Sequence, residues 1–411
     1  MRRSPNGFAP GCGDSRGIGR LLALLLAAGG LAGQSTPTAP TPTAQKAPVL
    51  VLLGGDAKPW QGWCAQRGWE LLTPWAGSSE RNIDLRIQAL EKQLAELEQR
   101  AGVDASRVYL VGQGEGATAV FYVAARAPDL WTAAVALGGT PRPAIDTNHL
   151  YAVNTANVPV LWLFAEARLE PLAKLLRDAG YNLESRQAAS ANPEQVFDWL
   201  AKHERDPHPA KVDCETGTPL FARCYWVQMT KFDPAEKNDV LVSTRVTAGS
   251  GAMLAAGPFG FDVSQPGPGV LVSQLPANYS GPLKTGDRIV AVGGKPLADA
   301  DAYVQLMDQT VEEKPVVIMV QRGENRIRVE TQIVLPRRDE LITARVQAQF
   351  LPEMKEIQVL SRAVAEMRVT VPAEWAPATI NWNGAEVAKE AAAGCWLLSV
   401  QKELLHAARC P

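Results

Sequence analysis

The stretch Val108-Tyr-Leu-Val-Gly-Gln-Gly-Glu-Gly-Ala-Thr-Ala-Val120 decides the fold of the first half of this chain. Val108 to Val111 form a short continuous apolar run, which is typical of a buried β-strand. Glycines at three alternate positions follow, and they permit a sharp backbone turn. A helix is expected from about Glu115. The stretch therefore predicts a strand-to-helix corner.

The sequence around this corner alternates in the same way between apolar runs and amphipathic segments. The clearest helix has apolar residues at spacings of three and four between Arg81 and Arg100, with charged residues on its other face. Strand and helix in alternation predict a parallel sheet covered by helices, so we assign an α/β domain to residues 48–206. The other predicted strands are 48–53, 69–74, 131–137 and 158–164, and the other predicted helices are 169–179 and 193–203.

These features resemble the α/β-hydrolase superfamily, especially its smaller esterase and dienelactone-hydrolase members. The resemblance rests on the strand ending in Gly54-Gly55, on residues 104–113, on residues 133–139 and on residues 158–163. In that family the corner is the nucleophile elbow, Gly-x-Ser-x-Gly. Here the elbow reads Gly112-Gln113-Gly114-Glu115-Gly116, and the position of the nucleophile has no side chain.

The resemblance also implies positions for the acid and the histidine that activate the serine. The acid position, after the strand at 158–164, is Arg168, and the stretch from Gln187 to Glu194 contains no histidine. We therefore predict no catalytic residue in this domain and interpret it as a silent scaffold. The alternative is a secreted esterase-like or peptidase-like hydrolase with a non-standard site, in which Glu115 or Glu166 activates water. Glu115 is also explained as an ordinary acid at the start of a helix, where the dipole favours its carboxylate form.

Residues 257–336 resemble a bacterial PDZ domain. The resemblance rests on Gly257-Pro-Phe-Gly-Phe261, on 269–275 followed by the Gly-Asp turn block 281–294, on a helix at 299–309 and on a strand at 315–322. It implies that an extended peptide adds to a sheet edge while backbone amides hold its carboxylate. The implied peptide-binding residues are Phe259, Gly260, Phe261, Val263, Tyr303 and Leu306. Phe259 and Leu306 are equally well explained as core residues.

The remaining segments, 207–256 and 337–411, alternate as strands. Residues 222–230 and 239–246 predict a hairpin, and 387–392 weakly predict a helix. The strands expected beyond Pro336 are 342–350, 356–364, 367–371 and 379–383. We expect the two segments to pair into one β module that carries the PDZ-like domain as an insertion.

The N-terminal 33 residues combine arginines, a short leucine-rich run and small residues, which is typical of a secretory signal. Residues 34–47 are rich in Pro and Thr and predict a linker. An exported protein, secreted or periplasmic, is expected to form disulfides. Spacing favours Cys214 with Cys224 and Cys395 with Cys410, although sequence alone does not fix the pairing. Cys64 is expected to be a buried thiol.

The composition narrows the classes of partner. The chain has 411 residues and a net charge of −2, so it lacks the basic surface that nucleic acids or anionic membranes attract. No later segment predicts a membrane span, and no spacing predicts a metal or cofactor site. The sequence therefore predicts an exported protein that binds peptide or protein C-termini, with an oligomeric state that the pattern leaves open.

Overall fold

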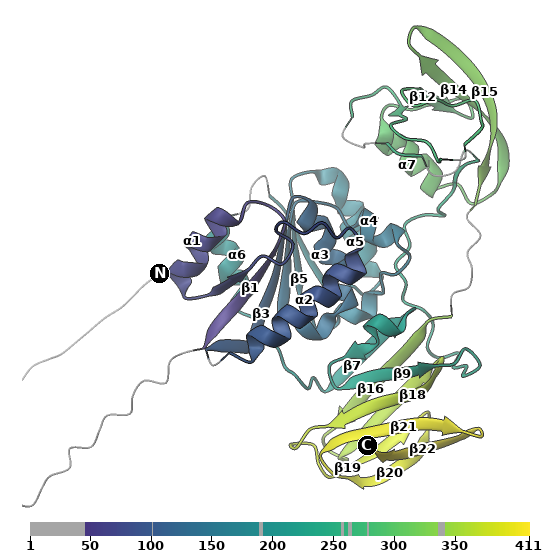
Figure 1. The fold of residues 1–411 in the computed structure, drawn as a ribbon. Coiled ribbons are helices and arrows are strands. Elements are labelled where there is room, and N and C mark those ends of the chain that lie inside the picture. The colour runs from purple at the N-terminus through teal and green to yellow at the C-terminus, as the bar shows by residue number, and fades with distance from the viewer. Residues whose placement is uncertain are drawn as a thin grey trace, which may run out of the picture. The chain divides into compact units, whose positions relative to one another are not determined.

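The computed structural model describes residues 46–100, 102–188, 192–255, 259–261, 265–277, 279–335 and 342–411. The predicted signal peptide, residues 1–33, and all but the last two residues of the predicted linker lie outside the described residues. Figure 1 shows the described elements as a ribbon.

The first domain is built on a six-stranded sheet in the order β2-β1-β3-β4-β5-β6, and all its strand pairs are parallel. Because the strands are parallel, their carboxyl ends meet at one edge of the sheet. The strands are β1 (Ala47–Leu53), β2 (Glu70–Leu72), β3 (Val103–Gln113), β4 (Ala133–Leu137), β5 (Val160–Phe164) and β6 (Leu183–Gln187).

Helices cover both faces of this sheet (Figure 1). One face packs against α1 (Ala57–Arg67) and α6 (Pro193–Leu200). Cys64 of α1 is a free, buried thiol, as predicted, and burial raises its pKa to about 11. The other face packs against α2 (Ile83–Glu98), α3 (Glu115–Arg126), α4 (Arg142–Asp146) and α5 (Glu170–Asp178).

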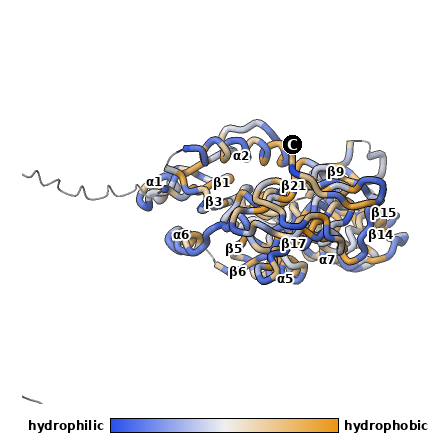
Figure 2. The backbone as a smooth tube through the Cα atoms, turned by 90° about the horizontal axis from the view of Figure 1, so that it is seen from below, coloured by the Kyte–Doolittle hydropathy of each residue, from blue (hydrophilic) through white to orange (hydrophobic). Residues whose placement is uncertain are grey.

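Helix α2 shows why these segments form a layer. Its buried side chains recur at spacings of three and four, and its opposite side is polar, as the alternating colours of Figure 2 indicate. The Asn82 side chain caps its first turn by accepting from the backbone N–H groups of Asp84 and Leu85. The buried residues of α2 are Ile87, Leu90, Leu94 and Leu97.

The second domain is a sandwich of two five-stranded sheets, ordered β20-β19-β17-β16-β7 and β22-β21-β18-β9-β8. The two distant segments pair as expected, because β7 is hydrogen-bonded to β16 and β9 to β18. Its strands are β7 (Lys211–Thr216), β8 (Arg223–Cys224), β9 (Val227–Phe232), β16 (Ala344–Leu351), β17 (Glu356–Arg362), β18 (Val364–Val371), β19 (Ala378–Trp382), β20 (Ala385–Ala391), β21 (Gly394–Gln401) and β22 (Leu404–Arg409).

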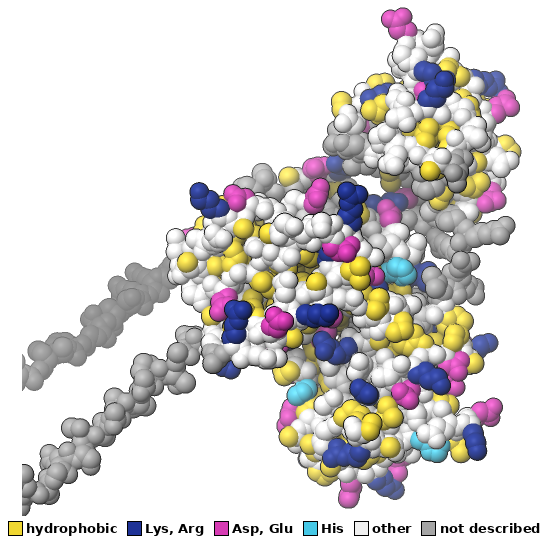
Figure 3. All heavy atoms as spheres, in the orientation of Figure 1, with side chains coloured by type: hydrophobic (Ala, Val, Ile, Leu, Met, Phe, Trp, Pro, Cys, Tyr) yellow, Lys and Arg dark blue, Asp and Glu magenta, His cyan; other side chains and the backbone are white. Residues whose placement is uncertain are grey.

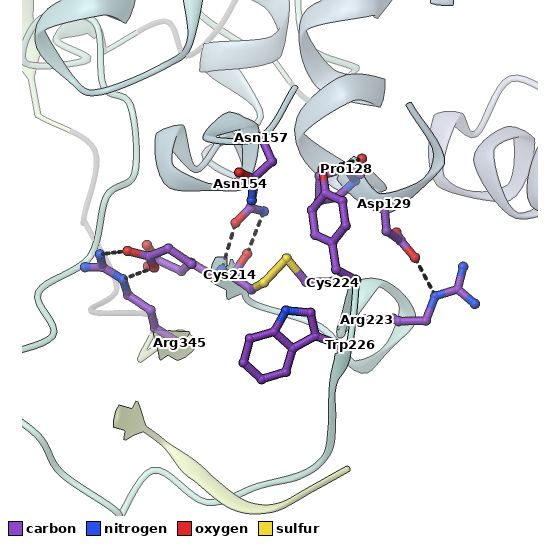
Figure 4. Close-up of a disulfide and its surroundings, with 12 residues drawn as sticks. Pro128, Asp129, Asn154, Asn157, Cys214, Arg223, Cys224, Trp226 and Arg345 are labelled. Atoms are coloured by element: carbon purple, nitrogen blue, oxygen red, sulfur yellow. Dashed lines mark hydrogen bonds and ion pairs between the residues drawn. A yellow bond between two sulfur atoms is a disulfide. The ribbon is translucent and has the colours of Figure 1, made fainter. Parts of the chain in front are cut away.

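Both predicted disulfides are present in the sandwich. Cys214 of β7 pairs with Cys224 of β8 and so joins the two sheets, beside Trp226 (Figure 4). Cys395 pairs with Cys410 and ties the last residues of the chain to β21. Chain crosslinks of this kind are typical of proteins in oxidising compartments.

The inserted domain lies between β9 and β16 in the chain. Its sheet has the order β10-β15-β14-β12-β11, and one helix packs against the same core. Its elements are β10 (Met253–Leu254), β11 (Val270–Leu271), β12 (Arg288–Val292), β13 (Lys295–Pro296), α7 (Ala300–Asp308), β14 (Lys314–Arg322) and β15 (Asn325–Val334).

Two predicted elements are wrong. Residues 239–246 form no strand beyond a single bridge between Arg245 and Tyr151. Residues 387–392, a weakly predicted helix, belong almost entirely to strand β20, which pairs with β19. Strands β6, β7, β15, β21 and β22 and the two-residue strands β10 and β13 were not predicted.

Across the described residues, none of the helices combines the length and the apolar character that a membrane span needs. Basic and acidic side chains are intermixed on the face shown in Figure 3. Such mixing fits the small net charge of −2.

Candidate functional site

The corner between β3 and α3 keeps the shape of a nucleophile elbow. Gly114 has φ +61° and ψ −125°, a conformation that L-residues with a side chain rarely adopt. Helix α3 begins at the next residue, so the amide of Glu115 lies in its first turn. An ideal Cβ at Gly114 would meet no atom within 4 Å. The corner therefore has the elbow's backbone and open space where a nucleophile's side chain would stand.

The other glycines of the frame are needed for close packing. A Cβ on Gly116 would lie 1.7 Å from the carbonyl oxygen of Leu53, and one on Gly112 would lie 2.3 Å from the oxygen of Gly116. Gly54, with φ +66°, brings the loop after β1 against the backbone of Gln113. This loop and the start of α3 lie together, as an oxyanion site requires.

The position that the hydrolase resemblance implies for the catalytic acid is occupied by a cation. Arg168 lies in a short 3-10 helix that follows β5. Its guanidinium is paired with the carboxylate of Glu166 and donates to Asp301 of α7 at 2.6 Å. A permanently charged guanidinium cannot accept the imidazole N–H that a catalytic acid accepts.

The chain has four histidines, and the structure places all of them away from the elbow. The carbonyl of His203 accepts from the Tyr109 hydroxyl, and the backbone amide of Arg205 donates to the carbonyl of Ser106 near the start of β3. His203 therefore lies toward the amino edge of the sheet. His149 lies within 4 Å of an ideal Cβ on Gly217, at the start of the sandwich segment. His208 bonds Glu374, and His406 is part of β22.

The acidic residues of the alternative mechanism have ordinary surroundings. Glu115 is exposed in the first turn of α3. The Arg86 guanidinium lies 3.7 Å from the centre of the Trp75 ring. Burial lowers its pKa, and the charges of Glu80 and Glu115 act in the opposite direction. Glu166 is exposed and paired with Arg168. No group of three His, Cys, Asp or Glu in the described part of the chain is placed to hold a metal ion.

A cavity of about 440 Å³ opens at the same edge of the sheet, beside the elbow. Its walls come from α1, from α6 and from the ends of β3, β4 and β5. Trp60, Trp63 and Gln113 line it, and the sequence prediction did not single out the two tryptophans. The sequence feature that could have identified them is their spacing. Trp60 and Trp63 are three residues apart and follow shortly after Gly54-Gly55-Asp56, so both lie on one side of the helix that begins there.

The residues that the PDZ resemblance implies for peptide binding lie in and beside the core of the inserted domain. Phe259 and Tyr303 are buried, at 8% and 5% exposure, and pack with Phe261 as three rings whose centres lie 5.5–5.7 Å apart. Phe259 is thus a core residue, which is the alternative that the sequence left open. Phe261 and Leu306 are half-buried at the edge of this core. Val263 lies outside the described residues.

The amide of Gly260 is engaged within the domain. It donates to the carbonyl of Gln274 at 2.7 Å, and the carbonyl of Gly260 accepts from Ser273 at 2.8 Å. Gly260 and Gln274 form an isolated antiparallel bridge outside the named strands. Binding of a peptide carboxylate by the Gly260 amide therefore stays a prediction, and it requires the bond to Gln274 to open.

Similar folds are found among solved structures of esterases. A thermostable esterase gives 16% identity and a TM-score of 0.29, covering 40% of this chain and 57% of its own length. Esterase PE8 gives 17% identity and a TM-score of 0.28, with coverages of 40% and 94%. A fungal esterase from Rhizomucor miehei gives 17% identity and a TM-score of 0.29, with coverages of 40% and 76%.

No protein-family model and no curated protein matched the chain. At such low identities and TM-scores the structural matches say nothing about activity. The assignment rests on the parallel sheet and on the glycine elbow between β3 and α3. The first domain has an α/β-hydrolase-like fold, and two further β-rich domains accompany it.

Proposed function

We propose that this chain is an exported binding protein in which the α/β-hydrolase-like domain is catalytically silent and the PDZ-like domain takes peptide or protein C-termini. The observation that carries the first half is Gly114, which occupies the elbow with the right backbone and no nucleophilic atom. The cation at Arg168 and the distant histidines agree with it. Removing the nucleophile from a serine hydrolase lowers turnover by about 10⁶-fold.

Peptide binding draws support from the edge of the inserted domain. Helix α7 begins at a side-chain cap, since Asp299 accepts from the amide of Ala302 at 2.8 Å. Half-buried Phe261 and Leu306 offer apolar surface beside it. Addition of an extended strand there uses main-chain hydrogen bonds for affinity and apolar side chains for selectivity. Because the Gly260 amide already donates to Gln274, the amides of Phe259 and Phe261 would bind the peptide carboxylate.

The test uses the intact chain and displayed C-terminal heptapeptides. The best binders are remade with free and with amidated C-termini, and titrated by fluorescence anisotropy. We expect amidation to weaken binding at least about tenfold, because a charge-assisted hydrogen bond is lost. Phe261→Ala and Leu306→Ala are expected to weaken it similarly, and exposed Val311→Ala serves as the control. Equal binding of amidated peptides would contradict carboxylate capture.

The competing function is ester or peptide hydrolysis through a non-standard site. The retained elbow backbone and the open space at Gly114 favour it. In this mechanism Glu115 or Glu166 activates water. Loss of turnover in Glu115→Gln, with turnover retained in Glu166→Gln, would establish Glu115 as the base. Unchanged rates in both variants would remove this mechanism.

The exported location is part of the same proposal. Both disulfides join residues of the sandwich. In a reducing cytosol they would not persist, and the sandwich would lose the stability that they provide. Peptide mapping of secreted and cytosolic material under non-reducing conditions tests this. We expect Cys214–Cys224 and Cys395–Cys410 peptides only from the exported form. Both pairs formed equally in a reducing cytosol would count against the assignment.

A further inference from the structure

The cavity beside the elbow has a rigid aromatic wall. Trp60 is 3% exposed, and its ring meets that of Trp63 edge to face, with centroids 5.2 Å apart and planes at 84°. The ring centroid of Phe197 in α6 lies 5.9 Å from that of Trp60. Trp63 is half-buried and lines the cavity together with Leu163 and Val196. A ligand meets these rings with little loss of side-chain entropy.

One polar group on this wall is held in a fixed orientation. The Trp60 indole N–H donates to Oε1 of Gln113 at 3.2 Å. Because an indole nitrogen only donates, this bond assigns the oxygen of the amide and leaves Nε2 as a donor. Gly55 makes room for the amide, since a Cβ there would lie 2.7 Å from Oε1. Gln113 therefore offers a positioned N–H to an acceptor atom in the cavity.

The charge at the cavity has one sign. Among the described residues that line the cavity, Asp56 is the only one that ionises, and none is Lys, Arg or His. Its carboxylate also caps α1 by accepting from the amide of Lys58 at 3.0 Å. An anionic ligand would be repelled and would find no cation to compensate its desolvation. A neutral ligand avoids both costs.

We propose that this cavity is a binding site for a neutral, ring-bearing small molecule that carries a hydrogen-bond acceptor such as a carboxamide or ketone oxygen. The ring lies against Trp63, Leu163 and Val196, and the acceptor takes the proton of Gln113 Nε2. The volume of about 440 Å³ lies within the usual range for small-molecule pockets. This site is independent of peptide binding, because it belongs entirely to the α/β domain.

The probes are naphthalene-2-carboxamide and naphthalene-2-carboxylate, which share size and ring and differ in charge. Each is titrated into the intact chain by isothermal calorimetry. We expect saturable one-to-one binding of the amide, and at least about tenfold weaker binding of the carboxylate, a ratio equivalent to about 1.4 kcal/mol. Absence of amide binding at millimolar concentration, or equal affinity for both probes, would overturn the proposal.

Three variants locate the site. Trp63→Ala is expected to weaken amide binding about tenfold, whereas Trp396→Ala, which removes a half-buried tryptophan from β21, is expected to leave it unchanged. Asp56→Asn keeps a capping side chain and removes the charge, so carboxylate affinity is expected to rise toward that of the amide. Equal effects of the two tryptophan variants, or unchanged carboxylate affinity in Asp56→Asn, would overturn the assignment.

Discussion

At the residue scale, the glycines of the elbow perform different tasks. Gly116 and Gly112 permit contact between backbones that any side chain would separate. Gly114 has open space and supplies only a left-handed φ of +61°. A serine at this position would fit sterically and cost about 1–3 kcal/mol in backbone strain. Packing therefore does not explain why the nucleophile is missing.

We predict that Gly116→Ala strongly destabilises the chain. The new Cβ would lie 1.7 Å from the Leu53 carbonyl oxygen and 2.2 Å from its carbon, and neither backbone atom can move independently of β1. The expected loss is about 3 kcal/mol or more in the free energy of unfolding. Urea unfolding of the intact chain, followed by tryptophan fluorescence, measures it.

The matched control is Gly62→Ala in α1. This glycine is exposed, and a Cβ there would meet no atom within 4 Å. Alanine is the better helix former by about 1 kcal/mol, so this variant is expected to gain stability. A Gly116→Ala variant as stable as Gly62→Ala would show that the contact between β1 and α3 is looser than described.

The strand-to-helix corner could be predicted because its glycines are visible in the sequence. The assignment of Arg168 to the acid position, and of the stretch without histidine after Gln187, followed from the predicted strands and the hydrolase resemblance. The cavity could not be predicted, since the bond from Trp60 to Gln113 joins residues 53 positions apart. Such a contact depends on how α1 packs over the end of β3, which no local pattern encodes.

At the scale of single elements, the inserted domain depends on one buried carboxylate. Asp287 follows the Gly286 turn before β12 and is 1% exposed. It accepts two bonds of 2.7 Å from the guanidinium of Arg322 at the end of β14, and another from the amide of Lys284. The bonds from Arg322 hold the pKa of Asp287 below its ordinary value. The pair thus fastens a turn to the far end of a strand.

We predict that Arg322→Ala lowers the urea midpoint of the inserted domain, because Asp287 is left buried without its partner. Arg328→Ala on β15 is the control, since Arg328 pairs with Glu330 at 3.5 Å on the exposed surface. Because the folded pKa of Asp287 is depressed, its stabilisation is present above the ordinary value of 3.8 and is lost as pH falls through the folded pKa. The difference between wild type and Arg322→Ala should therefore shrink in acid. A difference that is constant down to pH 2 would contradict this role.

Some elements were mispredicted for identifiable reasons. Residues 239–246 alternate like a strand, but their carbonyls at Leu241 and Val242 accept from Arg362 and Arg345 instead of a neighbouring strand. Residues 387–392 have helix-forming composition, yet pairing with β19 decides their conformation. Tertiary contacts outweigh local propensity in both segments.

At the scale of the whole molecule, the sandwich is made from two chain segments that the inserted domain separates. Glu215 of β7 fastens both junctions, and it is 1% exposed. Its carboxylate accepts from Ser243 Oγ at 2.5 Å and from the amide of Thr244 at 2.7 Å, before the insertion, and from the Thr343 hydroxyl after it. The two ends of the insertion are therefore close together.

We predict that residues 249–341 can be replaced by a Gly-Ser linker of about ten residues without loss of the other two domains. The shortened chain is expected to form both disulfides and to unfold cooperatively in urea. Non-reducing peptide mapping and circular dichroism measure these properties. Scrambled disulfides or a non-cooperative transition would show that the insertion is needed for the sandwich to fold.

Much of this organisation could be predicted. Alternation of apolar runs and amphipathic helices indicated the α/β domain, and the two β segments pair as expected, through β7 with β16 and β9 with β18. The sheet order within the sandwich could not be predicted from the sequence. Strands β17 and β19 pair in parallel in one sheet, although β18, which lies between them in the sequence, belongs to the other sheet.

We propose that the corner at Gly114 has the backbone of a nucleophile elbow without its nucleophile. The most direct measurement is the steady-state rate at which the intact protein hydrolyses p-nitrophenyl acetate, compared with Glu115→Gln at equal concentration. We predict a rate that rises linearly with substrate, shows no saturation and is the same for both proteins. A saturable rate in the wild type that disappears in Glu115→Gln would contradict the account.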